Sequence, residues 1–329
     1  MMLVLWCLGA VGSFGAVQLG EETSYARMCS ASAGVALSGD IFVVADDESN
    51  RLRTYSRTKP GVPIHEVDLR GFLQVGKGNP ETDVEGAAQI GDVVYWITSH
   101  GRNRDAEVRP SRQRFFATKV NGERLEPMGR AYGNLLTDLI ADERFRGFGL
   151  EEASQKAPNK KGGLNIEGLC ARPDGTLLIA FRNPVPKKKA LMIPLLNPAE
   201  LVQGRNVGSA AALAPPVRAK FGPAIQLELD DNGVRDLVQR GGEYFIIAGA
   251  RDGGHDTQVY RWDGANAPEK LHEWQAKTFN PEAILNVPGK PDEFLILSDD
   301  GGVKTAGKEC KEMPEASRIF RSVVLRIGK

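Results

Sequence analysis

The sequence predicts an all-β fold, a β-propeller with five blades, and two observations carry this prediction. A short motif recurs along the chain, in which a glutamate or a substitute precedes a small residue and an apolar stretch. Each copy leads through a turn into a strongly apolar run rich in the β-branched and aromatic residues that favour strands. Units of about 40–50 residues with four strands each are typical of propeller blades.

Five copies of this motif align. "VEGAAQI" contains Glu85, "IEGLCAR" contains Glu167, and "PEAIL" contains Glu282. In "VRDL" the glutamate is replaced by Arg235, and in the weakest copy, "SAGVALSGD", we align Ala33 with it. A third strand usually follows each apolar run and a fourth often does, which gives the plan of a blade.

The fifth unit lacks a fourth strand of its own. We expect the segment around Ala26–Ser30 to supply this strand and to close the ring. A disulfide between Cys29 and Cys310 would fasten the closure, and Cys170, inside an apolar stretch, is expected to be a buried thiol. A six-bladed propeller and a β-sandwich with helical insertions are the alternatives.

The apolar N-terminus resembles a secretory signal peptide, residues 1–15, cut after Gly15. Its first residues lack the usual lysine or arginine, so a buried first strand is the alternative. We expect residues 16–329 to form a single propeller domain with a helical and loop insertion at about 133–163. The expected location is therefore the periplasm or the outside of the cell.

Composition excludes several classes of function. The 329 residues include 42 basic and 42 acidic ones, and a net charge of zero gives no reason to expect nucleic acid or an anionic membrane as a partner. Beyond the N-terminus no apolar run approaches the ~20 residues of a membrane span. The chain also lacks the G-x-S-x-G, G-x-x-x-x-G-K, H-E-x-x-H and dinucleotide-binding motifs, and nucleophilic serine catalysis is therefore disfavoured.

Polar residues are expected to converge at one mouth of the central channel. The first strand of each blade lines the channel, and neighbouring strands are antiparallel, so the start of the first strand and the end of the second meet there. The predicted catalytic residues are Glu85, Glu167 and His100; the predicted substrate-binding residues are Arg102, Arg182, Asn183 and Arg251; the predicted metal ligands are Asp46, Glu282, Asp299 and Asp300.

This set of residues suits metal-assisted hydrolysis of an anionic ester, phosphoester or lactone. Carboxylates would bind Ca²⁺ or another divalent cation, arginines would hold an anionic group, and His100 or a glutamate would act as base. We expect no organic cofactor, a small anionic substrate as partner and a monomeric state. The alternative is a non-catalytic propeller that binds a glycan, peptide or protein at the same mouth, with Glu and Arg side chains pairing across blades.

The combination of "DVEG", "SHGRNR", "NIEGL", "AFRNP", "GVRDL" and "LSDDG" resembles an uncharacterised, mostly bacterial family catalogued as a domain of unknown function, from about residue 31 to 329. The motif residues shared with it are Glu85, Glu167, Arg182, Asp299 and Asp300, and the family offers no catalytic assignment. The "EGL" strands also resemble, more remotely, the esterase-like phytases. That resemblance implies a secreted propeller and allows phosphoester hydrolysis, although fold alone does not determine function.

Overall fold

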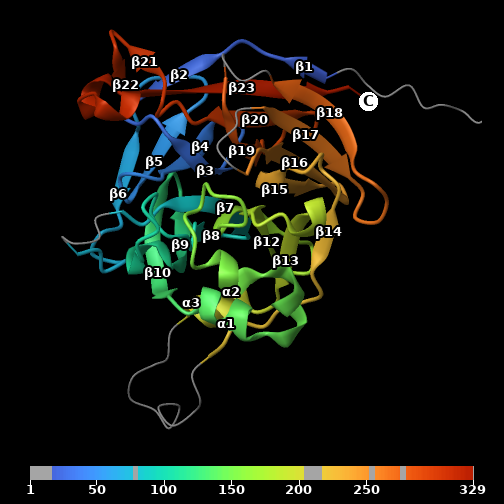
Figure 1. Ribbon diagram of the computed structural model, residues 1–329. Coiled ribbons are helices and arrows are strands. Elements are labelled where there is room, and N and C mark those ends of the chain that lie inside the picture. Colours follow the sequence, from blue (N-terminus) through green and yellow to red (C-terminus); the bar gives the residue numbers. More distant parts are fainter. Residues whose placement is uncertain (1–16, 77–80, 204–216, 252–255, 275–278, 329) are drawn as a thin grey trace, which may run out of the picture.

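A computed structural model describes residues 17–76, 81–203, 217–251, 256–274 and 279–328 (Figure 1). The predicted signal peptide, residues 1–15, lies outside these ranges. Among the described residues, no helix has the length and apolar character needed to cross a membrane.

The described strands form five antiparallel sheets of a β-propeller, as predicted. Blade 1 consists of β3 (Ala31–Ala36), β4 (Ile41–Asp46), β5 (Arg51–Ser56) and β6 (His65–Asp68). Blade 2 consists of β7 (Val84–Ile90), β8 (Val93–Thr98), β9 (Phe115–Asn121) and β10 (Arg124–Tyr132). Blade 3 consists of β11 (Asn165–Ala171), β12 (Leu177–Asn183), β13 (Ala190–Leu195) and β14 (Ile225–Leu227). Blade 4 consists of β15 (Gly233–Arg240), β16 (Glu243–Gly249), β17 (Thr257–Trp262) and β18 (Glu269–Trp274). Blade 5 consists of β19 (Pro281–Asn286), β20 (Glu293–Ser298), β23 (Ile319–Ile327), β1 (Val17–Leu19) and β2 (Thr23–Ala26).

The first strands of the blades form a closed inner ring. Strand β3 packs against β7, β7 against β11, β11 against β15, β15 against β19, and β19 against β3 again. Each interface between neighbouring blades has its own buried apolar cluster, such as Val43, Trp96 and Phe116 between blades 1 and 2. Burial of apolar surface is the dominant favourable term in folding, so these interfaces hold the ring together.

The N-terminal chain closes the ring, but with an earlier segment than the sequence predicted. Strands β1 and β2 pair with β23. Of the predicted segment, Ala26 belongs to β2 and pairs with Ile319, while the residues after it form the connection into β3, with a bridge between Ser30 and Asp299. Tyr25 of β2 stacks on Phe320 with ring centroids 5.1 Å apart. The predicted disulfide between Cys29 and Cys310 is present, and Cys170 is a buried free thiol.

Every first strand has a β-bulge near its start. In each one, the pairing with the second strand skips one residue of the first strand, and the skipped residues are Ser32, Glu85, Glu167, Arg235 and Glu282. A bulge redirects a side chain and interrupts the ladder, and such irregularities are frequent beside functional sites. The recurring glutamate motif is therefore the bulge of the inner strand. In blade 1 the equivalent residue is Ser32, so the alignment on Ala33 was wrong by one residue.

Helices occur mainly between β10 and β11. They are α1 (Leu135–Ala141), η2 (Glu143–Phe148) and α2 (Leu150–Ala153), and α3 (Pro198–Val202) follows β13. Short 3₁₀ turns occur at η1 (Pro110–Arg112), η3 (Pro186–Lys188), η5 (Cys310–Glu312) and η6 (Glu315–Ser317), and β21 (Lys304–Thr305) pairs with β22 (Lys308–Glu309). Leu139 of α1, Phe145 of η2 and Leu150 of α2 are buried in the cluster that joins blades 2 and 3.

The disulfide links segments that are 281 residues apart, so its loss is expected to destabilise the fold. Replacing both Cys29 and Cys310 by serine should lower the free energy of unfolding by about 2–4 kcal/mol, because the unfolded chain gains conformational freedom. Chemical denaturation without reductant measures this difference. The matched control is wild type in reductant, which should fall to the stability of the double variant; equal stability of oxidised wild type and the variant would contradict the prediction.

Candidate functional site

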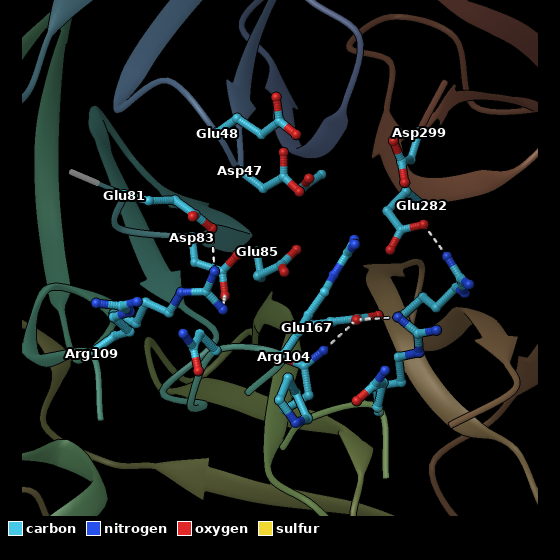
Figure 2. A pocket seen from close by; sticks show the side chains of 18 of the residues that line it. Asp47, Glu48, Glu81, Asp83, Glu85, Arg104, Arg109, Glu167, Glu282 and Asp299 are labelled. Atoms are coloured by element: carbon cyan, nitrogen blue, oxygen red, sulfur yellow. Dashed lines mark hydrogen bonds and ion pairs between the residues drawn. The ribbon is translucent and has the colours of Figure 1, made fainter. Parts of the chain in front are cut away.

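The bulged ends of the inner strands open into a polar cavity of about 980 Å³ (Figure 2). Acidic side chains outnumber basic ones in its lining, nine to seven among the described residues. The acidic residues are Asp47, Glu48, Glu81, Asp83, Glu85, Asp105, Glu167, Glu282 and Asp299; the basic residues are Arg104, Arg109, Arg112, Arg182, Arg235, Arg251 and Lys311. With all groups ionised, this lining carries a formal excess of two negative charges.

Three carboxylates meet at the centre of this cavity. One oxygen each from Glu85, Glu167 and Glu282 lies within 4.8 Å of the other two, and all three side chains are buried. They come from blades 2, 3 and 5, so only the closed ring brings them together. We call them the glutamate trio.

The three glutamates differ in their partners. Oε1 of Glu167 accepts hydrogen bonds from Arg182 and from Asn165, both at 2.7 Å, while its buried Oε2 has no partner among the described residues. Glu282 is paired with the buried guanidinium of Arg235. Glu85 has neither an ion pair nor a hydrogen bond within the described part of the chain, although it is 9% exposed.

Burial and mutual repulsion disfavour the ionised forms of two members of the glutamate trio. Burial, with the nearby charges of Asp83 and Glu167, raises the pKa of Glu85 well above its ordinary value. Burial also raises the pKa of Glu282 to about 8, although the charge of Arg235 opposes this shift. A bound cation would oppose both shifts, because it stabilises neighbouring carboxylates in their charged form.

Six of the eleven residues predicted from the sequence line the cavity. They are Glu85, Glu167, Arg182, Arg251, Glu282 and Asp299. Arg182 donates to the carbonyl of Ala250 as well as to Glu167, and Arg251 pairs with Asp231 at 2.8 Å. Asp299 accepts from the backbone N–H of Gly301 at 2.9 Å.

The predicted metal ligands Asp46 and Asp300 do not belong to the cavity lining. Asp46 is buried beside Arg53, at 3.5 Å, and also accepts from the N–H of Glu48. Asp300 is buried and pairs with Arg321 at 2.7 Å. Both aspartates therefore form internal ion pairs, whereas their neighbours Asp47 and Asp299 line the cavity.

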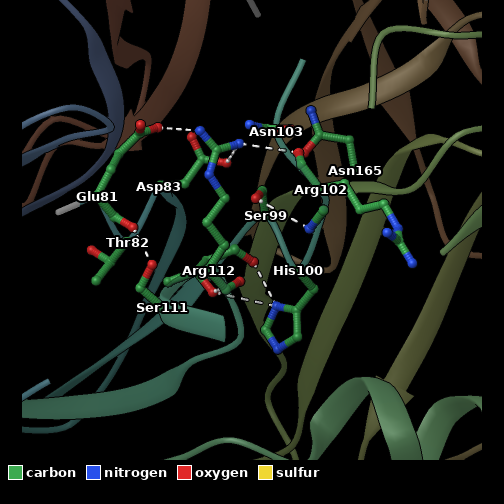
Figure 3. Close-up of polar contacts among 12 residues, drawn as sticks. Glu81, Thr82, Asp83, Ser99, His100, Arg102, Asn103, Ser111, Arg112 and Asn165 are labelled. Carbon is green, nitrogen blue, oxygen red and sulfur yellow. Dashed lines mark hydrogen bonds and ion pairs between the residues drawn. The ribbon is translucent and has the colours of Figure 1, made fainter. Parts of the chain in front are cut away.

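His100 also lies outside the cavity lining. Figure 3 draws its side chain and polar contacts. It is 1% exposed, and its Nδ1 donates to the carbonyl oxygen of Thr98 at 2.7 Å. Burial lowers its pKa to about 4. A neutral imidazole enclosed in this way has a structural role in the turn after β8 and does not reach the glutamate trio.

The predicted substrate-binding residues Arg102 and Asn183 hold the helical insertion in place. Arg102 donates to the carbonyl of Ser154 at 2.8 Å and to the side chain of Gln155. Asn183 donates from Nδ2 to the carbonyls of Pro158 and Lys160, at 2.9 and 2.8 Å. The segment that they fix contributes Pro158 and Asn159 to the cavity wall. Arg102 and Asn183 therefore affect the cavity indirectly, by holding this segment in position.

Sequence reasoning missed a second charged group at the mouth. Arg112 pairs with Asp83 at 2.9 Å and also with Glu81, and Figure 3 shows this arrangement. Burial and the charge of Asp83 raise the pKa of Glu81 to about 7. The position of Asp83, two residues before Glu85, was an available signal, whereas Arg112 lies in a long loop for which no sequence pattern predicts a position.

Fold and cavity together define a five-bladed β-propeller with an acidic channel mouth. The chain belongs to the family described as "Protein of unknown function (DUF3616)", whose model matches residues 116–293, more than half of the chain. The predicted membership of such a family is thus confirmed, over a shorter range than the sequence motifs suggested. No curated protein sequence matches the chain.

Several solved structures are similar to the chain over most of its length. Glutaminyl cyclase from Myxococcus xanthus has a TM-score of 0.49 and 14% identity, with 96% of this chain and 98% of that chain covered. The PQQ-bound aldose sugar dehydrogenase from Streptomyces coelicolor has a TM-score of 0.47, 13% identity, and coverages of 95% and 98%. The calcium-binding protein regucalcin from Agrobacterium tumefaciens has a TM-score of 0.41, 10% identity, and coverages of 91% and 92%.

The structural role of His100 predicts a specific dependence of stability on pH. The native imidazole binds a proton only near pH 4, whereas the unfolded one binds it near pH 6.5. Wild type should therefore lose stability relative to His100→Asn as the pH falls from 6.5 to 4, by about 1.4 kcal/mol per pH unit. Asparagine is suitable because His100 has a φ of 55°, which Asn tolerates.

Denaturation of both proteins at pH 4 to 8 measures this difference. The comparison with the variant is needed because several carboxyl groups titrate over the same range. Parallel curves for the two proteins would contradict a buried neutral His100.

Proposed function

We propose that the protein binds a divalent cation at the glutamate trio and hydrolyses an anionic ester, phosphoester or lactone there. The observation that carries the proposal is the approach of three buried carboxylates from three blades, with an unpartnered buried oxygen on Glu167. The formal excess of two negative charges in the cavity lining matches the charge of one such cation.

The spacing of the glutamate trio suits Ca²⁺. Two oxygen ligands of one Ca²⁺ lie at most about 5 Å apart, because each Ca–O distance is about 2.3–2.6 Å. The three oxygens, all within 4.8 Å of one another, meet this pairwise limit. Asp47 and Asp299 line the same cavity and could add oxygen ligands, since Ca²⁺ takes six to eight.

The three glutamates would have different roles in cation binding and catalysis. Arg182 and Arg235 fix Glu167 and Glu282, so these two carboxylates are suited to hold the cation in one place. A bound divalent cation supplies Lewis-acid polarisation of the ester oxygen. Glu85 has no competing partner among the described residues, so its carboxylate is available to act as the base. It would accept the proton of the attacking water and return it to the departing alcohol.

Two further expectations fit this proposal. The disulfide between Cys29 and Cys310 supports export, because such bonds persist in oxidising compartments. The remote resemblance of the glutamate motifs to the esterase-like phytases is the reason for proposing an ester as the reacting group. We propose a secreted or periplasmic monomer acting on a small anionic molecule.

Cation binding to the native state should raise the melting temperature. A hundredfold excess of Ca²⁺ over its dissociation constant stabilises by about 2.7 kcal/mol, and EDTA should reverse the effect. Glu167→Gln should reduce the shift, because a neutral amide holds a cation less tightly. Glu48→Gln is the matched control, as Glu48 lines the same cavity but is exposed and lies outside the glutamate trio. If neither Ca²⁺ nor Mg²⁺ changes the wild-type melting temperature, the proposed cation site is wrong.

The role of Glu85 as base is tested separately from cation binding. Glu85→Gln keeps an oxygen for the cation but cannot accept a proton, so turnover at saturating Ca²⁺ should fall roughly 10²-fold or more. The Ca²⁺-induced melting shift should become smaller, as in Glu167→Gln, but it should not vanish. Panels of phosphoesters, carboxylic esters and lactones, assayed with Ca²⁺, measure turnover. Equal turnover in Glu85→Gln and wild type would exclude Glu85 as the base, and no turnover by wild type with any substrate would favour the binding-module alternative.

A further inference from the structure

We propose that Arg104 is the residue that binds an oxyanion of the ligand, a phosphate or carboxylate group, opposite the glutamate trio. This inference deepens the proposed function and rests on it for the identity of the cavity as the ligand site. It replaces Arg102 and Asn183 as predicted substrate-binding residues, since both side chains donate to carbonyl groups of the helical insertion and neither lines the cavity.

The argument begins with the partners of the basic residues in the cavity. Six of the seven basic side chains are engaged in ion pairs, and their acidic partners are Glu107 for Arg109, Asp83 for Arg112, Glu167 for Arg182, Glu282 for Arg235, Asp231 for Arg251 and Glu309 for Lys311. Arg104 alone among the seven has neither an ion pair nor a hydrogen bond within the described residues. Its five N–H donors are therefore available for a ligand.

The backbone that carries Arg104 is held firmly. Oδ1 of Asn103 accepts from the N–H groups of Glu107 and Asp105, at 2.7 and 3.1 Å, and the N–H of Ala106 donates to the carbonyl of Asn103 at 3.0 Å. Arg102 fixes the start of this turn to the helical insertion at Ser154. A free side chain on a fixed turn is the arrangement expected of a binding residue, because little backbone order must be gained on binding.

The position of Arg104 also fits an oxyanion. Figure 2 shows its side chain reaching from the loop into the cavity toward the glutamates. Without a cation, the cavity lining has an excess of acidic groups and disfavours an anion. With the glutamate trio neutralised by a divalent cation, the guanidinium of Arg104 can pair with an oxyanion in bidentate fashion.

Titration calorimetry with methyl phosphate and with acetate tests the inference, and the two probes distinguish a phosphate from a carboxylate ligand. Wild type, Arg104→Gln and Arg109→Gln are compared with and without Ca²⁺. Arg109 is the matched control, because it lies in the same loop and lines the same cavity but is paired with Glu107 at 2.7 Å. We expect Arg104→Gln to weaken binding of the preferred anion roughly tenfold or more, Arg109→Gln to change it less than about twofold, and Ca²⁺ affinity to remain within about threefold in both variants.

The outcomes separate this inference from the proposed function. Equal anion affinity in wild type and Arg104→Gln, or no binding of either anion by Ca²⁺-loaded wild type, would overturn the role of Arg104. If Ca²⁺ does not bind but methyl phosphate or acetate binds in an Arg104-dependent way, the proposed cation site is wrong and the anion site stands.

Discussion

Closure of the ring is the constraint on which the rest of the structure depends. Residues from blades 2, 3 and 5 meet in the glutamate trio only because β3 packs against both β7 and β19. Two features close this ring: the pairing of β1 and β2 with β23, and the disulfide between Cys29 and Cys310. The apolar clusters between blades then stabilise a geometry that holds like charges together.

That geometry makes ionisation of the buried carboxylates unfavourable. Burial and the repulsion between neighbouring carboxylates raise the pKa values of Glu85 and Glu282. The arginines that pair with Glu167 and Glu282 compensate only part of this repulsion. Retaining such a cluster is unfavourable for stability alone, since an unpaired buried charge is costly. This imbalance is the physical reason for proposing a cation, and perturbed carboxylates in a cleft are typical of functional sites.

The sequence predicted the site best where residues belong to repeating strands. Glu85, Glu167 and Glu282 were found because the same motif recurs at the start of each inner strand, and the structure shows that this motif is a bulge. Prediction was poorer at the ends of the second strands, where "DD" and "HGRNR" do not reveal which of several nearby side chains faces the channel. Asp46, His100 and Arg102 were chosen there, and Asp47 and Arg104 line the cavity instead.

The sequence by itself determined the propeller and four of its five blade entries, because periodicity and turn residues are local signals. It also predicted the disulfide and a closure by the N-terminal chain, although an earlier segment supplies the closing strands. Only the tertiary structure decided which charges meet and which are already paired. Glu167 with Arg182 lies within one blade, whereas Arg235 with Glu282 and the glutamate trio cross between blades. Such contacts depend on the curvature of the closed ring, which brings together residues that are distant in the chain and leaves no pattern in the sequence around them.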